Sequence, residues 1–155
     1  MVKVGIFIDG MTLFHGLQGK RFHFGDFKEW LLQSDELGFA GYFNSVADVT
    51  SKEVFFSHVN KSGFNIFVRQ SSFDFISGKI DISSLNVELS LEAINHINDY
   101  DKFIIVSGKR DFLPLCEKII LCGKSVEVIG YENSVNKLFD KYPVRYLEDF
   151  IDKKK

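Results

Sequence analysis

The chain has 155 residues, of which 45% are hydrophobic and only two are proline, so it is neither disordered nor fibrous and is long enough for one globular domain. Its 19 basic and 21 acidic residues nearly cancel, which gives no global electrostatic argument for binding nucleic acid. There is no signal-peptide pattern and no apolar stretch of membrane-spanning length, so we expect a soluble cytoplasmic protein. Cys116 and Cys122 lack zinc-ligand spacing, and we interpret them as buried free thiols.

The first predicted strand runs from Val2 to Ile8 and is nearly continuous in apolar residues, as in a parallel strand covered on both faces. Asp9 follows where this run ends, and Gly10 lets the backbone turn out of the sheet. Ligands of open parallel α/β sheets bind beyond the carboxyl ends of the strands. Asp9 is therefore either a carboxylate that binds a metal or substrate, or the N-cap of the next helix; both interpretations stay open.

Helices and strands are predicted to alternate along the rest of the chain. The predicted helices cover residues 11–17, 26–32, 51–61, 85–98, 112–121 and 134–141, and the predicted strands cover 37–43, 64–68, 103–106, 125–130 and 144–147. Residues 70–84 are interpreted as a hairpin or an ordered loop. The alternation predicts an α/β fold with a mainly parallel twisted sheet flanked by helices, and it leaves the strand order open. We assign residues 1–150 to one domain and 151–155 to a short basic tail.

Two of the predicted helices carry residues whose environment the pattern also predicts. His58 lies within the apolar stripe of its helix and is interpreted as a core or boundary residue. In the helix 85–98, the residues predicted to face the core are Val87, Leu89, Leu91, Ile94 and Ile97.

Two predicted strands end in acidic turns, the first at Asp9 and the strand 103–106 at Asp111. If these strands are neighbours, both carboxylates project over one edge of the sheet, and Glu92 on the preceding helix adds a third. Clustered acids without a basic partner repel one another unless a cation is bound, and Mg²⁺ or Mn²⁺ suits oxygen ligands. Such a site supports attack of a metal-activated water on a phosphodiester. The alternative is that Asp111 caps the next helix and Glu92 is a solvated helix residue.

Segments along nearly the whole chain resemble the NYN domain family of PIN-like nucleases: IFIDG at 6–10, NVELSLEA at 86–93, VSGKRDFLPL at 106–115 and GKSVEVIG at 123–130. The resemblance implies a three-layer, Rossmann-like PIN-type fold and a Mg²⁺-dependent ribonuclease acting on RNA. It implies Asp9, Glu92 and Asp111 as catalytic metal ligands, with Asn86 assisting.

The chain departs from the family pattern at several positions. Met11 and Thr12 stand where the family commonly has two Asn residues, and Asn86 stands where it has an Asp. Glu92 replaces another Asp, and Lys109 replaces the first Asp of the Ser-Gly-Asp turn. Together the changes at Asn86 and Lys109 make the site about three charges less negative, which weakens Mg²⁺ binding.

Two functions follow from these patterns. The first is a metal-dependent ribonuclease of weakened activity. The second is a degenerate domain that binds RNA or a protein partner without cleavage, and a homodimer is left open. The predicted substrate-binding residues are Lys79, Ser107, Lys109 and Arg110. Further candidates are Arg69 for phosphate contacts, Phe73 and Phe75 for base stacking, and Asp81 as a replacement for the lost acid.

Two other classes of site are rejected. An aspartyl phosphotransferase would need its nucleophile where the chain has Phe7. A dinucleotide site would need Gly-x-Gly-x-x-Gly after the first strand, and that motif is missing there.

Overall fold

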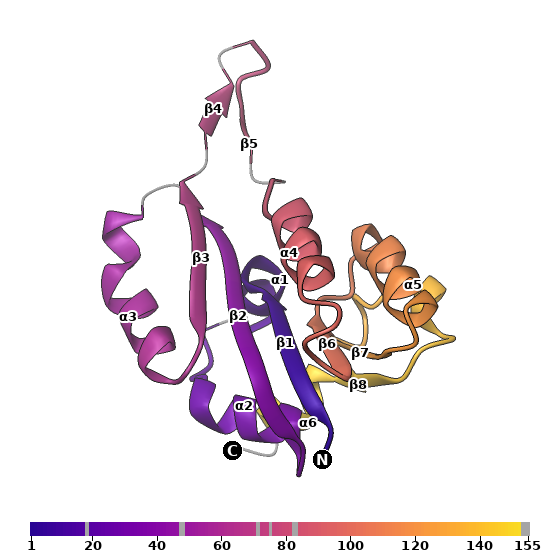
Figure 1. Ribbon diagram of the computed structural model, residues 1–155. Coiled ribbons are helices and arrows are strands. Elements are labelled where there is room, and N and C mark those ends of the chain that lie inside the picture. Colours follow the sequence, from indigo (N-terminus) through magenta and orange to yellow (C-terminus); the bar gives the residue numbers. More distant parts are fainter. Residues whose placement is uncertain (18, 47–48, 71, 75, 82–83, 153–155) are drawn as a thin grey trace.

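The computed structural model describes residues 1–17, 19–46, 49–70, 72–74, 76–81 and 84–152. One sheet has the strand order β3-β2-β1-β6-β7-β8, and every neighbouring pair in it is parallel (Figure 1). Its strands are β1 (Lys3–Asp9), β2 (Glu36–Val46), β3 (Asn65–Gln70), β6 (Lys102–Val106), β7 (Ser125–Gly130) and β8 (Val144–Tyr146). A separate antiparallel hairpin, β4 (Ser72–Asp74) and β5 (Lys79–Asp81), stands out from the end of this sheet.

Helices cover both faces of the sheet and give three layers. The α-helices are α1 (Gly10–Leu17), α2 (Phe24–Leu32), α3 (Glu53–Lys61), α4 (Ser84–Asn95), α5 (Leu113–Leu121) and α6 (Leu147–Ile151). Short 3₁₀ turns occur at η1 (Thr50–Lys52), η2 (Arg110–Phe112) and η3 (Lys137–Phe139). The predicted parallel α/β fold is confirmed. No helix among the described residues is long and apolar enough to span a membrane.

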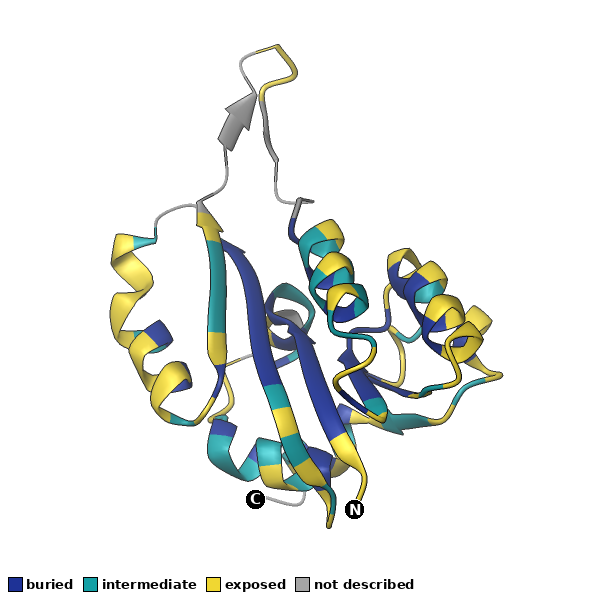
Figure 2. Ribbon diagram, viewed as in Figure 1, coloured by how far each residue is buried: buried dark blue, intermediate teal, exposed yellow. Residues whose placement is uncertain are grey.

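Side chains of the central strand β1 contribute to two hydrophobic cores, one on each face of the sheet. Val4, Ile6 and Ile8 face a core that is closed by α1, α2, α3 and α6. Phe7 faces the opposite core, which is closed by α4 and α5 and contains Phe103. All of these side chains are fully buried, so β1 has no polar face, and Figure 2 shows it dark blue along most of its length.

The strand register sets the position of the residues beyond the sheet. β1 lies between β2 and β6, with Asp9 beside Phe43 of β2 and Ile8 beside Val106 of β6. Ser107 follows Val106, so the ends of β1 and β6 lie together at the carboxyl edge of the sheet. The helix α1 starts directly after β1, and a Cβ at Gly10 would lie 2.5 Å from the Tyr42 hydroxyl oxygen. Glycine is thus needed at position 10 because the start of α1 lies too close to Tyr42 of β2 for a Cβ atom.

Several predictions of burial are wrong because α3 and α4 turn a different face toward the core than the one predicted from the sequence. His58 is exposed, since α3 buries Phe56 and Val59 instead. In α4 the buried residues Leu85, Leu89 and Ala93 repeat every four positions, as helical geometry requires.

Val87 and Leu91 are 62% and 56% exposed, because they lie on the other face of α4.

Cys116 and Cys122 are free thiols as predicted, but only Cys116 is buried. The helix predicted over 134–141 is reduced to the 3₁₀ turn η3, and the segment 70–84 contains the hairpin β4–β5.

Candidate functional site

Asp9 ends the central strand and is only 5% exposed. Its Oδ2 atom accepts hydrogen bonds from Thr12 Oγ1 at 2.7 Å and from Ser107 Oγ at 3.1 Å. The Thr12 backbone N–H points at Asp9 Oδ1 over a longer distance of 3.5 Å. Asp9 therefore sits at the N-cap position of α1 and, at the same time, at the carboxyl edge of the sheet.

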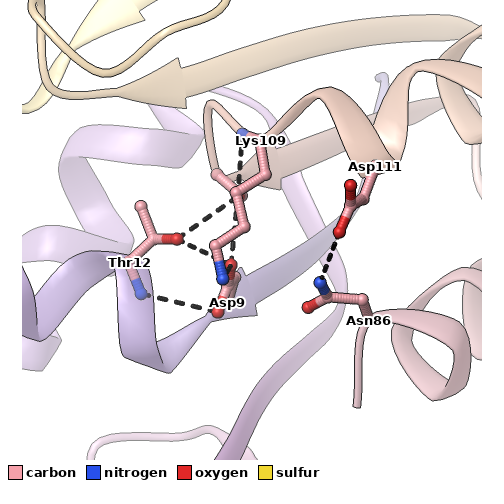
Figure 3. A network of polar contacts seen from close by, with 6 residues as sticks. Asp9, Thr12, Asn86, Lys109 and Asp111 are labelled. Atoms are coloured by element: carbon pink, nitrogen blue, oxygen red, sulfur yellow. Dashed lines mark hydrogen bonds and ion pairs between the residues drawn. The ribbon is translucent and has the colours of Figure 1, made fainter. Parts of the chain in front are cut away.

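Among the described residues, Lys109 forms an ion pair with Asp9. Its Nζ lies 3.3 Å from Asp9 Oδ2, and its side chain is 43% exposed, whereas that of Asp9 is 6% exposed. The Lys109 backbone N–H donates to Ser107 Oγ at 3.2 Å, so one hydroxyl contacts both partners of the ion pair. Figure 3 shows the Lys109 side chain reaching down to Asp9.

Asn86 and Asp111 form a second polar pair. Asn86 Nδ2, near the start of α4, donates to Asp111 Oδ2 in η2 at 3.0 Å (Figure 3). In the view of Figure 3 the pair lies on the side of Asp9 away from Thr12, and α4 also packs against β1. The structure therefore brings Asp9, Asn86, Lys109 and Asp111 to one edge, as two pairs that each contain one carboxylate.

Glu92, the third predicted metal ligand, contacts His96. Its carboxylate lies 3.2 Å from His96 Nε2, while His96 Nδ1 lies 2.7 Å from Asp99 Oδ2. The hydrogen bond to Asp99 is the main cause that raises the pKa of His96, and the negative charge of Glu92 adds to it. Glu92 is six positions from Asn86, which places the two about 120° apart around a helix.

The predicted substrate-binding residues have different environments. Ser107 is fully buried and its hydroxyl faces Asp9, whereas Arg110 is exposed at the start of η2. Arg69 forms an ion pair with Glu88. Lys79, Asp81 and Phe73 lie on the hairpin, but their side chains, like the whole of Phe75, lie outside the described residues.

The residues Asp9, Thr12, Ser107 and Lys109 are called the Asp9 cluster below. A pocket of about 500 Å³ adjoins this cluster on the side of α1 and α6. Thr12 and Lys109 line both the pocket and the cluster. In the pocket wall, Tyr131 donates its hydroxyl to the Leu13 carbonyl at 2.6 Å, and burial raises the pKa of Tyr131 to about 12. The other lining residues are Gly16, Lys20, Gly108, Asn133, Ser134, Glu148, Ile151 and Asp152.

Sequence reasoning missed two neighbours of Asp9. Thr12 is one, and its position three residues after an Asp at a strand end is a recognisable capping signal. Tyr42 is the other, and burial together with the nearby Asp9 charge raises its pKa, so this phenol stays neutral. Asn44 Nδ2 donates to the Tyr42 hydroxyl at 3.2 Å. No sequence spacing reveals Tyr42, because the sheet register alone brings β2 to Asp9.

The residues at this edge do not fit Mg²⁺, the metal that the sequence resemblance implies. Asp9 Oδ2 contacts two hydroxyls and an ammonium, and Asp111 Oδ2 accepts an amide N–H. Within the part of the chain that the structure describes, no three His, Cys, Asp or Glu side chains gather as a metal site. A Mg²⁺ ion needs several oxygen ligands with near-octahedral geometry, and here one oxygen of each carboxylate is already engaged by a protein donor.

Comparison with known proteins gives three findings. A family model described as the NYN domain matches residues 3–148, and no curated protein matches the chain. Among solved structures, the chain is similar to a protein of unknown function from Vibrio parahaemolyticus, with a TM-score of 0.83 and 22% sequence identity over 97% of this chain and 95% of that chain. At this identity the similarity concerns the fold.

Proposed function

Because the chain belongs to the NYN domain family, which is part of the PIN-like nuclease superfamily, we propose that it binds single-stranded RNA at the carboxyl edge of β1 and β6. Binding there uses the position at which open parallel sheets place their ligands. In this proposal the RNA backbone lies over Lys109 and Arg110, and the adjoining pocket accommodates part of a nucleotide.

The observation that carries the proposal is the Lys109 ammonium beside Asp9. An ammonium has three N–H donors, and the 43% exposed side chain of Lys109 leaves room for an acceptor besides Asp9. Arg110 follows directly and is exposed at the same turn. Phosphate oxygens are the acceptors that such neighbouring cations bind in nucleic acids, so this edge suits a phosphate group better than a metal ion.

A second candidate function is the metal-dependent cleavage of RNA that the family resemblance implies. Asp9 and Asp111 favour it, because both retained carboxylates lie at one edge of the sheet. This function requires Mg²⁺ or Mn²⁺ to displace the present partners of the two carboxylates, Lys109 and Asn86.

One experiment separates the two functions. A labelled single-stranded RNA pool is incubated with the protein in Mg²⁺, Mn²⁺ or EDTA, and both filter retention and cleavage are measured. Retention without cleavage supports binding alone. Cleavage that disappears in EDTA and in Asp9→Asn supports the ribonuclease. Absence of both retention and cleavage contradicts both functions.

The contribution of the two cations is measured with the double variant Lys109→Gln/Arg110→Gln. We expect the logarithmic salt dependence of RNA binding to flatten by about 1 for each lost phosphate contact. Lys118→Gln is the control, because Lys118 is an exposed cation in the last turn of α5. Equal retention by the double variant and the control would contradict the placement of RNA at Lys109.

A further inference from the structure

We infer that Lys109 is a built-in counter-ion that keeps divalent cations away from Asp9, so that the site operates with a fixed ammonium in place of a metal. This inference goes beyond RNA binding, since it concerns the cation at Asp9 whether or not RNA binds. It also distinguishes this chain from the NYN family pattern, which has an Asp at the position of Lys109.

The first support is the saturation of one carboxylate oxygen. Asp9 Oδ2 has Thr12 Oγ1 at 2.7 Å, Ser107 Oγ at 3.1 Å and Lys109 Nζ at 3.3 Å. A carboxylate oxygen has about two lone-pair positions, so three donors leave none for a metal. A divalent cation that uses Oδ2 would have to displace the ammonium. The other oxygen, Oδ1, has the Thr12 backbone N–H at 3.5 Å, and a cation bound there would still be repelled by the nearby ammonium.

The second support is electrostatic. Asp9 is 5% exposed, so salt screens its interaction with the 43% exposed Lys109 side chain less than it screens a pair of two exposed charges. At the neighbouring pair Asn86 is neutral, so Asp111 is the only carboxylate in the two pairs without a positively charged partner. A metal at Asp9 would meet the like charge of the Lys109 ammonium, and in these two pairs Asp111 is the one further carboxylate that would attract it.

The third support is the rigidity of the turn that carries Lys109. A Cβ at Gly108 would lie 2.6 Å from the Cα of Val135, so this turn packs directly against the loop before η3. The Gly108 carbonyl accepts the Asn136 N–H at 3.0 Å, and the Lys109 N–H donates to Ser107. The backbone of Lys109 is held on both sides, which keeps its side chain within reach of Asp9.

The test is Mn²⁺ binding to the full chain without RNA, measured by electron paramagnetic resonance of free Mn²⁺ and by calorimetry. We expect no stoichiometric Mn²⁺ binding by the wild type. Lys109→Asp reverses the charge and should bind one Mn²⁺ at least about tenfold more tightly than the wild type. Lys118→Asp makes the same charge change on exposed α5 and should gain nothing. Adding Asp9→Asn to Lys109→Asp should abolish the gain.

A second variant covers the case in which Lys109→Asp does not fold, because Asp9 and the new acid repel one another. Lys109→Gln removes the ammonium without adding a carboxylate, and we expect a smaller gain in Mn²⁺ affinity and a Mn²⁺-dependent rise in melting temperature. Stoichiometric Mn²⁺ binding by the wild type that Asp9→Asn abolishes would overturn the inference. A folded Lys109→Gln without any gain would overturn it too. Failure of RNA retention would contradict the proposed function alone.

Discussion

Arg145 and Glu127 form a two-point ion pair, with Nη2 at 2.8 Å from Oε1 and Nε at 2.9 Å from Oε2. The same guanidinium donates to the carbonyl oxygens of Trp30 and Leu31, both at 2.8 Å. Its Cζ atom also lies 4.6 Å from the centre of the Trp30 ring. One side chain of β8 therefore connects β7 to the end of α2.

Arg145→Ala should lower the free energy of unfolding by about 3 kcal/mol, because it leaves a carboxylate that is largely buried without its main partner. Lys102 Nζ lies 3.4 Å from Glu127 Oε1 and limits the loss. Urea denaturation measures the effect. Arg110→Ala is the matched control, since Arg110 is exposed, and it should change stability by less than about 0.5 kcal/mol. Equal effects of the two substitutions would show that the pair contributes nothing.

Gly16→Ala should destabilise the fold by about 2 kcal/mol, although alanine favours helices. A Cβ at this position of α1 would lie 2.1 Å from Cζ of the Tyr131 ring, which packs against the helix. The measurement is the shift of the urea midpoint. In a Tyr131→Leu background the same substitution should cost little. A similar cost in both backgrounds would locate the effect in the helix rather than at the ring.

Glu92→Gln should lower the pKa of His96, and Asp99→Asn should lower it more, because the hydrogen bond to Asp99 is the larger cause. A raised pKa in the folded state means that protonated His96 stabilises the fold below its ordinary pKa, and that this contribution is lost as the pH rises through the folded value.

NMR titration of the His96 ring measures these shifts, with Glu88→Gln on the same helix as control. An unchanged His96 pKa in Glu92→Gln would show that Glu92 does not contact His96.

The two cysteines should react differently with a thiol reagent. Burial raises the pKa of Cys116 from 9.0 to about 12, whereas Cys122 is exposed. At pH 8 we expect one thiol to react in the native protein and two in urea. Cys122→Ser should leave no reactive native thiol, and two native thiols in the wild type would contradict the burial of Cys116.

The same shift of Cys116 predicts a pH dependence of stability. The folded state disfavours the thiolate, so this contribution is complete below the pKa of the unfolded thiol and is lost as the pH rises from 9.0 to about 12. Unfolding midpoints over this range should fall less steeply in Cys116→Ala than in the wild type.

The sequence predicted the parts of the fold that depend on local pattern. The apolar run before Asp9 can only be buried in the centre of a sheet, so β1 and the edge position of Asp9 followed directly. The strand order did not follow, because it depends on pairings between β1, β2 and β6 that no local pattern encodes.

The internal arrangement of the candidate site was harder to predict. Asp9 and Asp111 were expected at one edge as metal ligands, and they lie there, but each has its own neutral or basic partner. The turn at Ser107 and the register between β1 and β6 decide which acceptor Lys109 contacts. The ion pair with Asp9 could therefore not be predicted from the sequence. The rotation of Glu92 away from Asn86, in contrast, follows from helical periodicity.

The hydrogen bond between Ser107 and Asp9 joins residues 98 positions apart, and this separation has a consequence for synthesis on the ribosome. A nascent chain that ends before β6 already contains β1, β2 and β3, but the central strand then lacks one of its two neighbours. Such an intermediate exposes one edge of the buried strand β1 until the second half of the chain emerges. Protection by a chaperone is therefore most valuable between the synthesis of β3 and that of β6.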